Sequence, residues 1–373
     1  MTVYSEILQD FAEEKRLRRL PEELAPGLID LSSNDYMSLG EHCKELIPEF
    51  MERFPDASFS SSASRLLSSK QKYHKKLESL LESLYGKPAL LFNSGYHANV
   101  GCISALTLPS TLFICDRLIH ASIIDGLRMA DSKFTRFPHN DINRLEAILK
   151  KEYDNFNRII IVVEAIYSMD GDEVPLRDLV ELKRRYPGIM LYLDEAHAFG
   201  VRGDKGLGLA EEKSLIEEID IIVGTLGKAA ASAGAFIISS EELKLFFINT
   251  ARPFIFSTAL PPVNAAWSIM MIERLNSMKQ EREHLSAISS YFAKHIEEIS
   301  GRNTGSTSQI IPFLTGDSAR SLDIAAKLKE AGFIALPIRR PTVPPGGERI
   351  RFSLCSDMKP EDFDDLFQIL SAL

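Results

Sequence analysis

Cysteine and long apolar runs are both scarce in this 373-residue sequence. The four cysteines, Cys43, Cys102, Cys115 and Cys355, have no Cys-x-x-Cys spacing, which disfavours a disulfide framework and a metal-thiolate site. We therefore expect reduced structural cysteines and no bound metal. The longest apolar stretches, 159–163 and 260–271, are too short or too interrupted to cross a bilayer. These absences predict a cytoplasmic protein without a membrane partner.

Basic charge is also in short supply. The sequence has 43 Lys and Arg against 52 Asp and Glu, a net charge of −9, and its one basic cluster is at 16–19. This balance argues against nucleic acid as a partner. Residues 1–15 are acidic and amphipathic, unlike a signal peptide. A chain of this length predicts two substructures rather than one core.

Short apolar runs alternate with helical patterns in the middle of the sequence. The expected strands are 89–92, 112–115, 134–137, 159–163, 190–193, 219–223 and 235–238. Such alternation predicts an α/β fold, in which helices cover both faces of a mostly parallel sheet.

The rest of the sequence predicts a smaller α+β domain. Long helices are expected within 261–298, followed by strands at 309–314, 333–338 and 348–354 and helices at 319–331 and 360–370. A helix at 4–19 and a strand at 28–31 are expected before the polar loop at 58–65. We predict an N-terminal segment, 1–60, that packs with the small domain, a large domain at 61–260, and connecting helices plus the small domain at 261–373.

Two of the expected strands end close to a reactive side chain. Asp194 follows the strand at 190–193, and Lys228 follows the strand at 219–223. Ligands of open α/β sheets bind outside the carboxyl ends of strands. A lysine and an acidic residue are the groups with which pyridoxal phosphate enzymes hold the cofactor aldehyde and ring nitrogen. Taken singly, Lys228 also fits a surface lysine, and Asp194 fits a helix N-cap.

Other residues could complete such a site. His120 could stack on an aromatic ring and His197 could reach a phenolic oxygen, although each also fits a structural histidine. Gly95 opens a helix after a strand, where free N–H groups favour a phosphate, and a plain turn fits there too. Arg349 and Arg351 share one face of an expected strand, which suits a carboxylate ligand or a solvated edge strand.

Glycine-rich nucleotide motifs are missing around these residues. Gly95 lacks the Gly-x-Gly-x-x-Gly and Gly-x-x-x-x-Gly-Lys-Ser/Thr patterns, which disfavours dinucleotide and P-loop sites. The segment 200–206 is glycine-rich without the helix-opening spacing, and we expect a loop there.

Assembled, these motifs resemble the α-oxoamine synthase family of fold-type I pyridoxal phosphate enzymes. The resemblance runs nearly end to end, through Leu31-Ser32-Ser33-Asn34-Asp35-Tyr36, Ser94-Gly95-Tyr96, Asp116-Arg117-Leu118-Ile119-His120-Ala121-Ser122, Ser168-Met169-Asp170-Gly171-Asp172, Asp194-Glu195-Ala196-His197, Thr225-Leu226-Gly227-Lys228 and Ser257-Thr258. It implies the fold-type I architecture with a large sheet domain and a small α+β domain.

The resemblance also implies pyridoxal 5′-phosphate as the cofactor and a role for each matching residue. Lys228 would bond to the cofactor aldehyde, Asp194 would pair with the ring nitrogen, and His120 would stack on the ring. The other implied contacts are Ser168 and His197 with the phenolic oxygen, and Ser94, Gly95, Tyr96 and Thr225 with the phosphate. Ser257 and Thr258 would reach the phosphate from the second subunit of a homodimer, Asn34 and Arg351 would bind the amino-acid carboxylate, and Thr342 and Arg18 would contact the acyl substrate.

The implied activity is a decarboxylating condensation of an amino acid with an acyl thioester. The segment 341–346, leading into Arg349, resembles the branch of the family that joins L-alanine to a pimeloyl thioester of coenzyme A or an acyl carrier protein in biotin biosynthesis. The alternatives are a branch using glycine or serine with another acyl-CoA, and a non-catalytic scaffold with the same fold. The presence of Lys228, Asp194, His120 and His197 together favours an enzyme.

Two segments depart from the family pattern. Ser60-Ser61-Ser62-Ala63-Ser64 replaces a glycine-rich stretch, and Tyr36-Met37-Ser38-Leu39 replaces Tyr-Leu-Gly-Leu. Both belong to the substrate-access side in this family. They therefore bear on the choice of acyl chain more than on cofactor chemistry.

Overall fold

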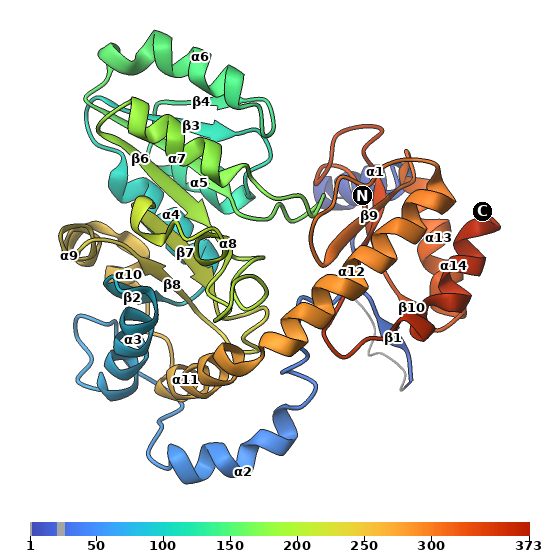
Figure 1. Ribbon diagram of the computed structural model, residues 1–373, viewed down its shortest axis with the longest axis horizontal. Helices are drawn as coiled ribbons and strands as arrows, with labels where there is room; N and C mark the ends of the chain where they lie inside the picture. Colours follow the sequence, from blue (N-terminus) through green and yellow to red (C-terminus); the bar gives the residue numbers. More distant parts are fainter. Residues whose placement is uncertain (1, 21–26) are drawn as a thin grey trace. The chain divides into compact units, whose positions relative to one another are not determined.

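A seven-stranded sheet forms the framework of the larger part of the chain. The computed structural model describes residues 2–20 and 27–373, and within them the strand order of this sheet is β2-β8-β7-β6-β5-β3-β4 (Figure 1). The strands are β2 (Ala89–Phe92), β3 (Thr111–Asp116), β4 (Phe134–Phe137), β5 (Arg158–Glu164), β6 (Ile189–Asp194), β7 (Ile221–Thr225) and β8 (Ala235–Ile238). All neighbours from β4 to β7 are parallel, and β8 runs antiparallel to β7 and β2. The predicted mostly parallel sheet is confirmed.

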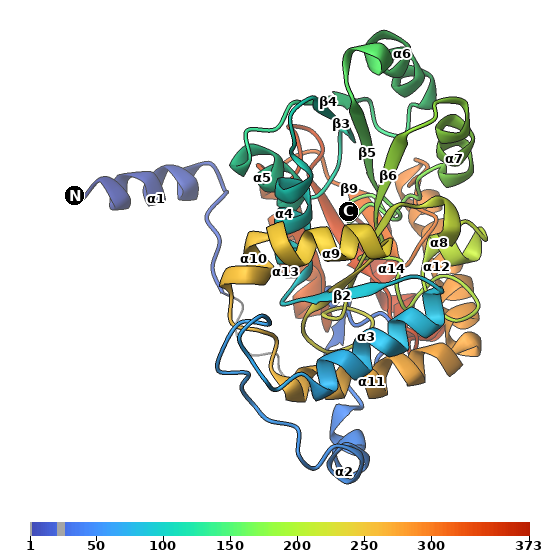
Figure 2. The ribbon, with the colours of Figure 1, turned by 90° about the vertical axis from the view of Figure 1, so that its left-hand side faces the viewer.

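Helices cover both faces of this sheet, which is why its strands are apolar along their length. One face packs α4 (Gly95–Leu106), α5 (Ala121–Met129), α9 (Glu241–Thr250) and α10 (Arg252–Phe256) into a single apolar cluster with alternate strand residues such as Val162 and Val223 (Figure 2). The opposite face carries α3 (Lys72–Tyr85), α6 (Ile142–Glu152) and α7 (Leu176–Arg185). The strand interiors are therefore shielded from water.

The carboxyl ends of four parallel strands lie at one edge of the sheet. β3, β5, β6 and β7 end at Asp116, Glu164, Asp194 and Thr225, and Glu164 is the register partner of Asp194. A row of polar groups thus follows the buried apolar strands at the edge where α/β folds bind ligands.

The chain divides into two compact units. The large unit contains 35–168 and 173–282, and the small unit contains 1–34, 169–172 and 283–373. The large unit also includes α2 (Cys43–Arg53), α8 (Leu209–Glu212), α11 (Pro262–Ser277), the 3-10 turns η1 (Tyr153–Asn155) and η2 (Ile216–Glu218), and the first residues of α12 (Lys279–Ser300). No helix among the described residues is long and apolar enough to cross a bilayer.

The small unit is built on a three-stranded antiparallel sheet in the order β11-β12-β9. Its strands are β9 (Ile310–Leu314), β11 (Leu336–Ile338) and β12 (Arg349–Ser353), while β1 (Ile29–Asp30) pairs in parallel with β10 (Phe333–Ile334). Its helices are α1 (Val3–Glu13), α13 (Ser318–Glu330), η3 (Pro360–Phe363) and α14 (Asp364–Ser371). Phe292 of α12 packs on Phe352, Phe363 and Phe367, so aromatic rings form the core of this unit.

The first helix is shorter than the sequence predicts. The periodicity predicts a helix through residue 19, but α1 ends at Glu13, and Lys15 has a left-handed φ of +57°. Such a backbone conformation stops an α-helix. The described residues that follow have no regular secondary structure, and Arg18 contacts Thr342.

Candidate active site

A chain of hydrogen bonds leads from Lys228 into the interior of the large unit. Lys228 is half-buried on the loop after β7, and its Nζ lies 2.7 Å from Nε2 of His197. On the other side of the imidazole, Nδ1 lies 2.7 Å from the hydroxyl of Tyr36. Tyr36 is 0% exposed and His197 is 6% exposed. The sequence predicts Lys228 and His197, but it assigns no role to Tyr36.

Local hydrogen bonds shape the loop that carries Lys228. Thr225 Oγ1 accepts from Gly227 N–H at 3.3 Å, and Leu226 N–H donates to Gly234 O at 2.9 Å. The loop therefore turns back toward β8 immediately after β7. This turn fixes the backbone of Lys228 beside the sheet edge.

Asp194 is a buried carboxylate at the end of β6, held in place by two donors. Asn99 Nδ2 donates to Oδ2 at 2.7 Å, and the Ala196 N–H donates to Oδ1 at 2.9 Å. Tyr192 in turn donates its hydroxyl hydrogen to Asn99 Oδ1 at 2.7 Å. Turns rather than a helix follow Asp194, so it is not a helix N-cap. Asn99 is a site residue that the sequence analysis misses.

His120 caps the N-terminus of α5 and is tied to the same amide. Its Nδ1 accepts from the Ser122 N–H at 3.2 Å and lies 2.7 Å from Ser122 Oγ, which accepts from Asn99 Nδ2 at 2.9 Å. Burial lowers the pKa of His120 and the positive charge of Lys228 lowers it further, against the opposing effect of Asp194. The imidazole is therefore neutral at neutral pH, which suits stacking on a cationic ring.

Glu164 adds a second carboxyl beside Asp194. It ends β5 next to Asp194 in register and is 3% exposed. Burial raises the pKa of Glu164 well above its ordinary value, and the charge of Asp194 raises it further. Its Oε1 has no hydrogen-bond partner within the described part of the chain. Burial beside Asp194 therefore favours the protonated form of Glu164.

The turn between β2 and α4 forms a cradle for an anion. Ser94 caps α4 by accepting from the His97 N–H at 3.2 Å, and the first N–H groups of the helix follow it. A Cβ at Gly95 would lie 3.8 Å from Thr225 Cβ, so the two predicted phosphate residues are neighbours. Tyr96, half exposed, donates to Asp125 Oδ2 at 2.7 Å. Backbone donors at a helix N-terminus favour a phosphate.

Ser257 and Thr258 border the same turn within one chain. Asn93 Nδ2 donates to Ser257 Oγ at 3.0 Å and to Thr258 O at 2.6 Å. Asn93 immediately precedes the cap Ser94. Ser168, the remaining candidate of the large unit, is half-buried on the segment after β5.

In the small unit, Arg351 and Asn34 form one pair of candidates. Arg351 is 3% exposed, and it donates to Asn34 Oδ1 at 3.1 Å and to Ser353 Oγ at 2.7 Å. β12 is the central strand of its sheet, so the interpretation of Arg349 and Arg351 as a solvated edge pair is wrong. Arg349 forms an ion pair with Asp170, so of the two arginines Arg351 is the better candidate for a carboxylate ligand.

Arg18 and Thr342 form the second pair. Arg18 Nη2 donates to Thr342 Oγ1 at 2.9 Å, and both residues are exposed. The two residues that the sequence assigns to the acyl substrate are therefore in contact, although 324 positions separate them.

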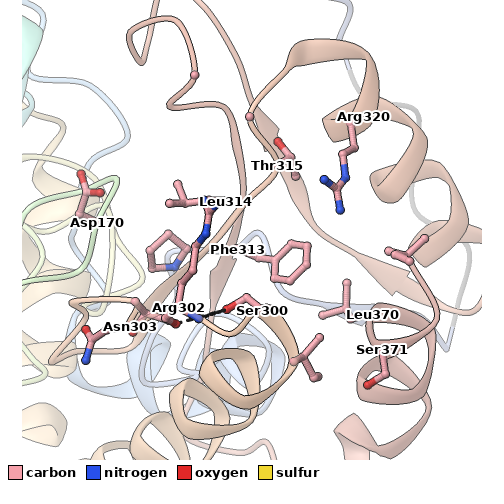
Figure 3. A pocket seen from close by; sticks show the side chains of 16 residues that line it. Asp170, Ser300, Arg302, Asn303, Phe313, Leu314, Thr315, Arg320, Leu370 and Ser371 are labelled. Atoms are coloured by element: carbon pink, nitrogen blue, oxygen red, sulfur yellow. Dashed lines mark hydrogen bonds between the residues drawn. The ribbon is translucent and has the colours of Figure 1, made fainter.

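A cavity of about 360 Å³ also lies in the small unit, between the loop after α12, β9 and the start of α13 (Figure 3). Arg302, Arg320, Phe313 and Leu370 are among the side chains that line it. Its described lining includes none of the predicted site residues. The candidate active site of the large unit is therefore a separate feature.

The residues of the large unit fit pyridoxal phosphate. A half-buried amine, a buried carboxylate fixed by two donors, a neutral imidazole and a helix N-terminus next to Thr225 belong to the same carboxyl edge of one sheet. These are the groups that the aldehyde, the ring nitrogen, the ring face and the phosphate require.

Comparison with known proteins supports the same conclusion. Residues 26–370 match the family model of aminotransferase class I and II. A protein of Haemophilus ducreyi (strain 35000HP / ATCC 700724), 8-amino-7-oxononanoate synthase, is 40% identical over 388 residues, which cover 99% of this chain and all of that protein.

Solved structures resemble the whole fold. Serine palmitoyltransferase from S. paucimobilis with a bound PLP–myriocin aldimine superposes with a TM-score of 0.88 at 26% identity, over 100% of this chain and 98% of the other. The 8-amino-7-oxononanoate synthase of Francisella tularensis gives a TM-score of 0.77 at 25% identity, over 93% of this chain and 98% of the other.

Fold and site together define a fold-type I enzyme that uses pyridoxal phosphate. The chain belongs to the aminotransferase class I and II family, and within it to the α-oxoamine synthases. The expectations of fold class, catalytic nature and cofactor are confirmed.

Proposed function

We propose that this enzyme condenses L-alanine with a pimeloyl thioester, releasing carbon dioxide, the free thiol and 8-amino-7-oxononanoate, a step of biotin biosynthesis. The observation that carries the proposal is the match to the H. ducreyi synthase, because 40% identity extends over the full length of both proteins. The proposal is a finer statement than membership of the family, since relatives with the same cofactor use different substrates.

In this proposal each site residue of the large unit has a separate role in the reaction. Pyridoxal phosphate supplies an electron sink for negative charge at the α-carbon of the amino acid. Asp194 keeps a negative charge opposite the ring nitrogen, and His120 covers the ring face. Lys228 removes the α-proton of alanine and needs its amine neutral for this step. Its Nζ lies 2.7 Å from His197 Nε2, the neighbouring polar group.

Substrate recognition falls to residues of the small unit in this proposal. Arg351 and Asn34 bind the carboxylate of alanine, since a buried guanidinium forms strong charge-assisted hydrogen bonds with a carboxylate. Arg18 and Thr342 contact the pimeloyl substrate, and the positive charge of Arg18 suits the distal carboxylate of the pimeloyl chain.

Condensation of serine with a long-chain thioester is the second candidate. The TM-score of 0.88 with serine palmitoyltransferase exceeds that of 0.77 with the Francisella synthase. Backbone similarity reports the fold, whereas side chains select the substrate. The identity of 40% to the H. ducreyi protein against 26% to serine palmitoyltransferase therefore favours alanine and pimeloyl thioester.

A substrate panel tests the proposal. Purified holoenzyme is given alanine, glycine or serine with pimeloyl, acetyl, succinyl or palmitoyl thioesters of coenzyme A, and the ketone product is identified by mass spectrometry. Pimeloyl-acyl carrier protein is compared with pimeloyl-CoA in a second series. We expect the highest kcat/KM with alanine and a pimeloyl thioester. A preference for glycine with acetyl-CoA, or for serine with palmitoyl-CoA, would replace the proposed reaction with that of another branch.

We also propose that the enzyme acts as a homodimer. Large apolar side chains remain exposed in the single chain, including Tyr96 beside the phosphate turn and Phe256 beside Ser257, at 49% and 70% exposure. Exposed apolar surface next to a site is typical of a protein interface. Light scattering should give a mass of about two chains, and a monomer at micromolar concentration would contradict the proposal. No disulfide joins the four cysteines within the described residues, which supports action in the reducing cytoplasm.

A further inference from the structure

His197 forms hydrogen bonds with Tyr36 and with Lys228, and with a neutral imidazole these two bonds can be arranged in two ways. Both links measure 2.7 Å, and a neutral imidazole donates through one nitrogen and accepts through the other. If Tyr36 donates to Nδ1, then Nε2 carries the hydrogen and the Lys228 amine must accept it. If Lys228 donates to Nε2, then Nδ1 carries the hydrogen and the oxygen of Tyr36 accepts it.

These two directions differ in the charge of the reactive amine. A lysine nitrogen has a lone pair for accepting only when the amine is neutral, whereas an ammonium group can only donate. Donation from Tyr36 therefore requires a neutral amine at Lys228, whereas donation in the opposite direction is compatible with either charge state of the amine.

Chemistry favours donation from Tyr36. A phenol is a far better donor to an imidazole nitrogen than an imidazole N–H is to a phenol oxygen, because phenol is the stronger acid and imidazole the stronger base. Tyr36 and His197 are both buried, so water does not compete for the hydrogen bond between them. Burial of the half-buried amine also disfavours its charge.

We propose that Tyr36 is a positioning residue that fixes His197 as the Nε2–H tautomer and thereby favours the neutral, nucleophilic form of Lys228. The same tautomer presents an N–H donor toward the phenolic oxygen that the cofactor brings to the site. Tyr36 touches neither substrate nor the reacting atoms in this scheme and acts through the imidazole. The inference depends on the cofactor and is independent of the substrates proposed above.

Other ionisable groups interact electrostatically with Lys228 and must stay unchanged in a test of Tyr36. The charge of Lys228 acts on His120 and on Glu164, and Asp194 acts on both of these groups as well. His120, Glu164 and Asp194 take no part in the hydrogen bond between Tyr36 and His197. Removal of the Tyr36 hydroxyl therefore changes the chain without removing a charge.

Tyr85→Phe is a matched control for Tyr36→Phe. Tyr85 is 3% exposed, and its hydroxyl donates to Leu207 O at 2.7 Å, away from His197. Both variants delete one buried hydroxyl group. A difference between them reports the role of Tyr36 rather than a general loss of stability.

The direct test is the tautomer of His197 in the apoenzyme. Long-range 1H–15N correlation spectra of 15N-histidine-labelled protein at pH 8 distinguish the two tautomers, and His197→Gln assigns the signal. We expect the Nε2–H form in the wild type and in Tyr85→Phe, and a mixture of both tautomers in Tyr36→Phe. An Nδ1–H tautomer in the wild type would overturn the proposal whether or not the variant folds.

A second measurement follows the amine. The rate at which apoenzyme takes up pyridoxal phosphate is recorded by absorbance between pH 6 and 10. We expect Tyr36→Phe to be slower at pH 7 by about tenfold, which is the effect of one net hydrogen bond, and to recover as the pH rises and the amine loses its proton. Identical pH profiles for Tyr36→Phe and Tyr85→Phe would overturn the proposal, even if the substrate panel had given the expected products.

Discussion

Asn99 and Asp194 meet through a hydrogen bond of 2.7 Å between the amide nitrogen and the buried carboxylate. The same amide nitrogen donates to Ser122 Oγ, which contacts His120 Nδ1 at 2.7 Å. Asn99 thus contacts the carboxylate proposed to pair with the ring nitrogen and, through Ser122, the imidazole proposed to cover the ring.

Asn99→Ala should weaken cofactor binding. It removes a donor to a charged carboxylate and leaves the buried Tyr192 hydroxyl without its acceptor. We expect the Kd for pyridoxal phosphate to rise by about 10- to 100-fold, since a hydrogen bond to a charged group contributes about 1.5–3 kcal/mol. Fluorescence titration of the apoenzyme measures this constant. Asn249→Ala, which removes an exposed amide on α9, should leave it unchanged, and equal effects in both variants would contradict the assignment.

Lys228→Ala should abolish condensation without unfolding the protein. The loss of kcat should exceed about 1,000-fold, as for other residues that act within a catalytic unit. Thiol release from the acyl thioester measures turnover, and circular dichroism checks the fold. Lys205→Ala, on an exposed loop, is the matched control. Turnover by the Lys228 variant within tenfold of the wild type would remove the lysine from the mechanism.

Arg351→Lys should separate substrate binding from chemistry. Lysine keeps the charge but loses the planar fork that binds a carboxylate through two hydrogen bonds. We expect KM for the amino acid to rise by about 10- to 100-fold, the equivalent of about 1.5–3 kcal/mol, with kcat much less affected. Arg302→Lys, in the exposed loop after α12, should match the wild type. An unchanged KM in Arg351→Lys would reassign carboxylate binding to another residue.

Glu195 should make stability depend on pH. This carboxyl is 0% exposed, and burial raises its pKa to about 7 although Leu209 and Ala210 N–H groups donate to it. The pKa of Glu195 in the folded protein lies above the unfolded value of 4.5. The contribution of Glu195 to the free energy of unfolding is therefore fully present below pH 4.5 and is lost as the pH rises to about 7.

Glu195→Gln cannot lose a proton, so its stability relative to the wild type should improve with pH. The gain between pH 4.5 and 8 should be about 3 kcal/mol, from the linkage of the pKa difference to the free energy of unfolding. Urea denaturation of the apoenzyme at both pH values measures it. A difference between variant and wild type that stays constant with pH would show that Glu195 does not titrate in this range.

Gly224→Ala should destabilise the sheet behind Lys228. A Cβ at this position would lie 2.2 Å from Cζ of Phe236, its register partner on β8. Overpacking of this kind costs about 1–3 kcal/mol of unfolding free energy, measurable by denaturation. The second change Phe236→Leu should recover part of the loss, because it removes the clash. If the double variant loses as much unfolding free energy as the two single variants together, the clash with Phe236 is not the cause of the destabilisation.

Local patterns predicted the sheet well but placed β7 two residues early. The apolar run begins at Ile219, whereas β7 begins at Ile221, because the Asp220 side chain accepts from the Leu191 N–H and from Lys183 before the ladder starts. A side chain that replaces a ladder bond is a tertiary feature. Apolar periodicity contains no sign of it.

The sequence predicts the site residues whose chemistry follows from the residue type. It misses those whose role depends on a tertiary contact. Lysine, aspartate and histidine at strand ends point to a cofactor by themselves. Asn99 and Tyr36 act through partners 95 and 161 positions away, and no local pattern predicts such pairs. Tyr36 belongs to the quoted motif Leu31-Ser32-Ser33-Asn34-Asp35-Tyr36, which is the one available signal, whereas Asn99 belongs to no quoted motif. Arg349 shows the reverse case, because its pairing with Asp170 excludes the substrate role that its spacing suggested.

The pairing of β1 with β10 has a consequence for synthesis of the chain on the ribosome. Ile29 of β1 pairs with Phe333 of β10. On the ribosome β1 can therefore pair only after about 300 further residues have been translated. At typical elongation rates of about 5–20 residues per second this delay is about 15–60 s. Throughout it, β1 lacks its strand partner, while residues 35–282, which contain the large unit, are already synthesised. The pairing of β1 with β10 can form only after synthesis of β10, and truncation before Phe333 would leave Ile29 without its strand partner.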